Sequence, residues 1–152
     1  MIRDFENIII KTVCRAIIPF IQLYGLYVIA HGHYSPGGGF QGGCILAASF
    51  ILMVLAYDIK EMKKRMSEKI NTILCSTGVI IYTGIGLLCV ILGANFLDYG
   101  ILEIILPADA EHSRSLGILG VEIGVGFTVM AVMVSIFLNI ASAGEHEDGE
   151  QG

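Results

Sequence analysis

Long stretches without a charged residue constrain this chain more than any other feature of its sequence. No Asp, Glu, Lys or Arg falls within residues 16–57, and none falls within residues 70–97. A helix needs about 20 mostly apolar residues to cross the hydrocarbon core of a bilayer, which is roughly 30 Å thick. Uncharged runs of this length therefore predict helices that span a membrane.

The composition agrees, because 55% of the residues are hydrophobic and only 15% are charged, against about 25% charged residues in a typical soluble domain. The apolar runs are continuous rather than alternating, which favours helices over the strands of a membrane barrel. We predict an all-α membrane bundle with four spans, at residues 8–30, 39–57, 70–93 and 116–140. Residues 1–140 are expected to form one domain, followed by an acidic, disordered tail at residues 141–152.

The basic residues predict the orientation of these spans. Eight of the nine lie before Ala16 or between the second and third spans, and only Arg114 falls on the opposite side. The positive-inside rule then puts both termini in the cytoplasm of a multi-pass protein of the cell membrane. The basic loop at residues 60–69 can also contact anionic lipid headgroups, although a plain topology signal is the favoured interpretation.

A glycine-rich stretch, "HGHYSPGGGFQGG" at residues 31–43, joins the first two spans. Part of it matches the GxGxxG pattern of dinucleotide sites, but that pattern works only after a strand and inside a βαβ unit. Between two apolar spans, the proline instead ends a helix, and the glycines permit a tight turn and close helix packing. The turn and packing residues that we predict are Pro36, Gly37, Gly38, Gly39, Gly42 and Gly43, together with Gly120, Gly124 and Gly126 of the fourth span.

Glu122 is the only formal charge in the fourth span. It lies about seven residues, or ~10 Å, from the outer end of that span, and ionisable groups at such depth often mark ion or proton paths. Burial favours the neutral acid and a nearby cation favours the carboxylate, so such a site can exchange H⁺ for Na⁺. We predict ion-path roles for Glu122, His31, His33 and Ser115; a purely structural carboxylate is the alternative.

Other kinds of chemistry have little support in the sequence. The cysteines Cys14, Cys44, Cys75 and Cys89 are scattered without CxxC spacing, so we expect no zinc or iron–sulfur ligation and no other metal or cofactor. Nothing indicates nucleic-acid binding. An isolated nucleotide-binding or metal-binding enzyme is the weakest interpretation, and we expect no enzymatic activity in this chain.

Two stretches together resemble a known family. "GHYSPGGGFQGG" at residues 32–43 and "VEIGVGFTV" at residues 121–129 are similar to motifs of the MnhB, or MrpB, subunit of Mrp-type multisubunit sodium/proton antiporters, with Glu122 where aspartate is common. The resemblance spans residues 8–140. It implies a non-catalytic subunit that works with other membrane subunits in moving Na⁺ and H⁺.

Related subunits also occur in archaeal membrane-bound hydrogenase and similar respiratory complexes, where any redox chemistry belongs to partner subunits. We favour such an archaeal complex on the resemblance. Two roles for the chain stay open at this point. It either lines the ion path through Glu122, or it is purely an assembly subunit whose glycines pack neighbouring membrane subunits.

Overall fold

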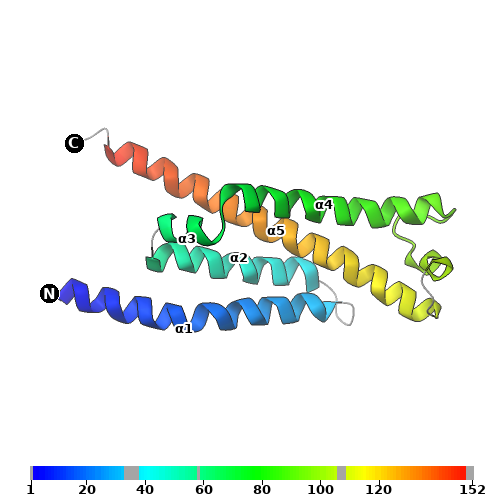
Figure 1. Cartoon of the computed structure of the whole chain (residues 1–152), viewed down its shortest axis with the longest axis horizontal. Helices are drawn as coiled ribbons and strands as arrows, with labels where there is room; N and C mark the ends of the chain where they lie inside the picture. Colours follow the sequence, from blue (N-terminus) through cyan, green and yellow to red (C-terminus); the bar gives the residue numbers. More distant parts are fainter. Residues whose placement is uncertain (1, 33–37, 58, 106–108, 150–152) are drawn as a thin grey trace.

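The computed structural model describes residues 2–32, 38–57, 59–105 and 109–149, with the side chains of residues 2–7, 110 and 143–149 left aside. The described residues form helices and no strand (Figure 1). Four helices are long and apolar enough to cross a membrane, within residues Ile8–Ala30, Gly38–Tyr57, Glu68–Ile91 and Glu111–Ser142. The prediction of an all-α bundle with four spans is confirmed.

The helices in chain order are α1 (Ile2–Ala30), α2 (Gly38–Tyr57), α3 (Ile59–Arg65), α4 (Glu68–Ile91), the 3-10 helix η2 (Tyr99–Ile104) and α5 (Ala110–Gly149). The sequence analysis did not predict α3 or η2, because both are too short to carry a periodic apolar pattern. Helix α5 extends into residues 141–152, and the disordered tail proposed for that segment stays a prediction.

The last helix of the chain occupies a central place in the bundle. Helix α1 packs against α2, α2 packs against α5, and α5 packs against α4, so α5 lies between two helices that precede it in the sequence (Figure 1). The start of α1 and the end of α5 lie at the same end of the bundle. That agrees with four antiparallel spans.

The core follows from this arrangement. Its buried apolar side chains come from α1, α2, the α3–α4 corner and α5: Ile29, Leu46, Ala47, Val54, Met62, Met66, Met130 and Val134. By contrast, large apolar side chains on the outer face of α1 are exposed, for example Phe20 at 72%. A spanning helix presents such a face to lipid or to another membrane subunit.

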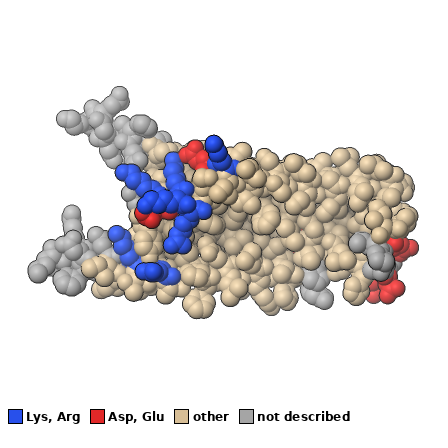
Figure 2. Space-filling view, in the orientation of Figure 1, with Lys and Arg blue, Asp and Glu red and all other residues tan. Residues whose placement is uncertain are grey.

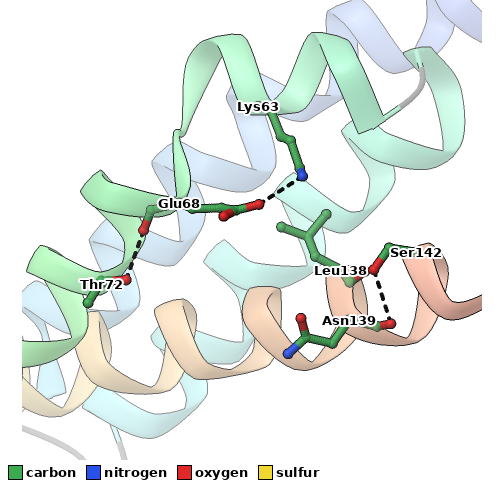
Figure 3. A network of polar contacts seen from close by, with 6 residues as sticks. All are labelled: Lys63, Glu68, Thr72, Leu138, Asn139 and Ser142. Atoms are coloured by element: carbon green, nitrogen blue, oxygen red, sulfur yellow. Dashed lines mark hydrogen bonds and ion pairs between the residues drawn. The ribbon is translucent and has the colours of Figure 1, made fainter.

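The end of the bundle where α1 begins carries most of the basic residues, which gather there in Figure 2. At this end Lys63 of α3 pairs with Glu68 of α4 at 2.8 Å, beside the last part of α5 (Figure 3). Ser67 caps α4 by accepting a hydrogen bond from the Ile70 N–H at 3.3 Å. The pairing and the cap turn the chain sharply from α3 into α4.

Candidate ion site at Glu122

The carboxyl group of Glu122 lies where α1 ends and α2 begins. Its Oε2 atom is fully buried, although the residue as a whole is only half-buried. A Cβ atom on Gly32 would overlap this carboxyl group, and one on Gly38 would lie 3.0 Å from Oε2. On Gly39 a Cβ would lie 2.5 Å from the Glu122 backbone oxygen. Three glycines therefore leave the space that the acidic residue fills.

The start of α2 also supplies a favourable electrostatic environment for this carboxyl group. Helix α2 begins at Gly38, beside Oε2 of Glu122. The first N–H groups of a helix have no acceptor inside the helix, and they carry partial positive charge. This end of α2 stabilises the ionised form of Glu122, while burial of Oε2 away from water favours the neutral form.

Further glycines bring α1, α2 and α5 into close contact, on the side of Glu122 that faces the middle of the bundle. A Cβ on Gly43 would lie 2.7 Å from the backbone oxygen of Gly126, and one on Gly42 would lie 2.8 Å from the oxygen of Gly25. The Cβ position of Gly126 is 2.7 Å from Cδ1 of Ile29. These approaches fix the axial position of α5 against the two preceding helices, and with it the depth of Glu122.

The glycines on the other face of α5 approach α4. The Cβ position of Gly124 is 2.8 Å from the backbone oxygen of Gly78, and that of Gly120 is 2.8 Å from Cδ1 of Ile85. Asn71 of α4 adds hydrogen bonds from its side-chain N–H₂ to the Ala131 oxygen at 3.0 Å and to Ser135 Oγ at 2.6 Å. The predicted packing glycines therefore contact helices of this same chain.

Tyr99 is a neighbour of the site that sequence reasoning missed. It belongs to η2 and packs on α5, where a Cβ on Gly117 would lie 2.7 Å from its Cδ1 atom. Burial raises the pKa of the Tyr99 phenol, with further contributions from Tyr82, Cys89 and the Glu122 carboxylate. Because its pKa is raised, the Tyr99 phenol stays neutral at physiological pH. The sequence offered no reason to select Tyr99, because a single tyrosine between two spans belongs to no recognisable pattern.

The remaining predicted residues are distributed around this centre. His31 directly precedes Gly32; its ring is exposed, stacks on Tyr27 at 4.1 Å between centroids, and has Nδ1 3.2 Å from the Tyr27 oxygen. Ser115 is half-buried on α5, two turns before Glu122. His33, Pro36 and Gly37 lie outside the described residues.

Gly32 is the most informative residue that the sequence analysis did not select. It lies inside the conspicuous glycine-rich stretch, but between the two histidines rather than in the run of glycines. Its importance depends on Glu122, which is 90 residues further along the chain. No local pattern could have paired them.

Comparison with known proteins gives consistent relatives. Residues 9–135 match a family described as a domain related to the MnhB subunit of Na⁺/H⁺ antiporter. A protein of Staphylococcus haemolyticus, assigned by its name to antiporter subunit mnhB2, is 31% identical over 137 residues, covering 90% of this chain and 95% of that protein. A protein of Staphylococcus aureus with the same name is 29% identical over 136 residues, with the same two coverages.

Proposed function

Because this chain belongs to the family related to the MnhB subunit of Na⁺/H⁺ antiporters, we propose that it contributes Glu122 to the path that sodium ions and protons take through the complex. The chain is an MnhB-like subunit of an Mrp-type antiporter and has no catalytic role of its own. Its task is to hold one ionisable group at a defined depth inside the membrane.

The observation that carries this proposal is the packing of the Glu122 carboxyl group against Gly32 and Gly38. An exchange site needs a carboxyl group that is stable in both charge states. Burial of Oε2 favours the protonated form, and the positive end of α2 favours the carboxylate. In this proposal the Glu122 carboxyl group takes up H⁺ and binds Na⁺ in turn.

His31 and Ser115 have supporting roles in the proposal. His31 lies next to Gly32 in the chain, and its imidazole ring is exposed. Ser115 lies on the face of α5 that leads toward Glu122 and offers a hydroxyl to a passing ion or water. His33 is included with His31 on the sequence alone.

The partners are the other membrane subunits of the antiporter. Exposed apolar side chains on α1 and α4, such as Phe20, Leu23 and Ile80, offer surfaces for them or for lipid. The staphylococcal relatives are named for an antiporter, so the hydrogenase-containing archaeal complex has no support from them. With the basic end in the cytoplasm, both termini are cytoplasmic and Glu122 is nearer the outer surface.

The test is sodium-dependent proton transport by vesicles that carry the complete complex with Glu122→Gln, alongside a pull-down of all subunits. Gln keeps the shape of the side chain and cannot release a proton. We expect transport to fall by at least tenfold while the complex stays assembled. Glu122→Asp, which retains the carboxyl group, is expected to keep part of the activity.

A matched control is Glu111→Gln, which removes an exposed carboxylate from the first turn of the same helix. It is expected to transport normally. Full transport by an assembled Glu122→Gln complex would contradict the proposal. A role confined to assembly has weaker support, because the glycines that suggested it pack against helices of this chain.

A further inference from the structure

A second feature lies at the opposite end of the bundle from Glu122. There, an open cavity of about 310 Å³ is lined by residues of α1, α2 and α3. Arg15 and Ile18 come from α1, Met53 and Tyr57 from α2, and Glu61 and Arg65 from α3. None of these residues belongs to the proposed ion site, so the cavity needs its own explanation.

The described side chains that line the cavity carry more positive than negative charge. Two guanidinium groups line it, against one carboxylate. Glu61 already pairs with Lys64 at 2.5 Å. Among the side chains that the structure describes, neither Arg15 nor Arg65 has an acidic partner. The cavity therefore attracts an anion.

Two of the apolar residues that line the cavity are held in place by the core. The side chains of Ile18 and Met53 are only 5% and 4% exposed and pack together in the core. At the rim, Tyr57 donates a hydrogen bond from its hydroxyl to the Lys11 backbone oxygen at 2.7 Å, which ties the end of α2 to α1. Phe20, further along α1, presents an exposed apolar side chain.

We propose that this cavity binds the headgroup of an anionic phospholipid, with Arg15 and Arg65 contacting the phosphate. A guanidinium group offers donors in a planar fork that matches phosphate oxygens. The α3 residues that line the cavity belong to the basic end of the membrane bundle (Figure 2), where charged headgroups meet the protein. The long side chain of Arg15 can extend toward that end from within the first span. The acyl chains would follow the exposed apolar face of α1.

The site is independent of Glu122, so its test does not use transport. The intact complex, purified and stripped of lipid, is incubated with phosphatidylglycerol or with phosphatidylcholine and examined by native mass spectrometry. We expect one phosphatidylglycerol per complex to be retained in preference to phosphatidylcholine. In the Arg15→Gln, Arg65→Gln variant this lipid should bind about 25-fold more weakly, from roughly fivefold for each lost charge near a membrane surface.

The matched control is Lys60→Gln with Lys69→Gln, which removes the same charge from two exposed residues that do not line the cavity. It is expected to retain the lipid. A second variant, Arg15→Lys with Arg65→Lys, keeps the charge and the topology signal, and should bind with intermediate affinity. This variant keeps the proposal testable if the glutamine pair fails to assemble.

Three results would overturn the proposal. Equal loss of lipid in the lysine control and in the arginine variant would indicate diffuse attraction rather than a site. Displacement of the lipid by millimolar inorganic phosphate would indicate a site for the free anion. Loss of a neighbouring subunit from the arginine variant, with lipid binding unchanged, would assign the cavity to an acidic segment of that subunit.

Discussion

The carboxyl group of Glu122 fills the space in which a Cβ atom of Gly32 would lie. The acidic residue of α5 and the end of α1 are thereby joined at the turn that leads into α2. This contact explains the glycine content of residues 31–43 by more than the flexibility of the turn. Part of its glycine content provides room for one ionisable side chain from the far end of the sequence.

The first prediction concerns Gly32→Ala. The added methyl group would overlap the Glu122 carboxyl group and force this end of the side chain from its place. We expect sodium-dependent proton transport to fall at least tenfold in an assembled complex. The control is Gly84→Ala on α4, where a Cβ meets nothing within 4 Å; equal activity of the two variants would argue against the relationship.

The second prediction concerns the contact between α2 and α5. In Gly43→Leu, the Cβ would lie 2.7 Å from the backbone oxygen of Gly126, which cannot move aside without shifting a helix. We expect this variant to be lost from the complex in a pull-down, and Gly43→Ala to be only partly retained. Wild-type recovery of the leucine variant would show that the close approach is dispensable.

The third prediction concerns Asn71, which is 6% exposed and bonds Ala131 and Ser135 across the α4–α5 interface. Interhelical hydrogen bonds in membranes average about 0.6 kcal/mol and reach about 1.7. Asn71→Leu should therefore lower the thermal midpoint of the complex in detergent by a few degrees. Thr72→Val, which removes a bond only to the Glu68 oxygen of the same helix, should leave the midpoint unchanged within error.

The fourth prediction is an alkaline instability caused by Tyr99. Burial raises the pKa of its phenol, so the folded state holds the proton more tightly than the unfolded state. This contribution to stability is complete below pH 10 and is lost as the pH rises beyond that value. Tyr99→Phe should lose less thermal stability than the wild type between pH 8 and pH 11, whereas Tyr24→Phe, at an exposed residue, should behave as the wild type.

The fifth prediction tests the orientation of the bundle. The four native cysteines are first replaced by serine or alanine. Single cysteines are then introduced at Glu111 and at Lys64, two exposed residues at opposite ends of the bundle. A membrane-impermeant maleimide should label Glu111→Cys in intact cells and Lys64→Cys only after permeabilisation. The reverse pattern would put the termini outside the cell.

Much of the fold could be predicted because it depends on local properties of the chain. The number of spans followed from long apolar runs with few charges, and the structure ends the first spanning helix at the predicted residue Ala30. The short helices α3 and η2 were not predicted, because six or seven residues are too few to show a periodic pattern of apolar residues. Glu122 could be selected as a candidate because a single charged residue in an apolar span stands out in the sequence, whatever the arrangement of the helices.

The sequence by itself determined that this chain has four apolar helices long enough to cross a membrane, a cluster of basic residues and one acidic residue in the last apolar run, since hydropathy and charge act on each segment separately. Only the tertiary structure decided which segments meet. It placed α5 between α2 and α4, brought Glu122 onto Gly32 and Gly38, and gathered two arginines around one cavity. Such pairings depend on packing between residues far apart in the chain, and no local pattern encodes them.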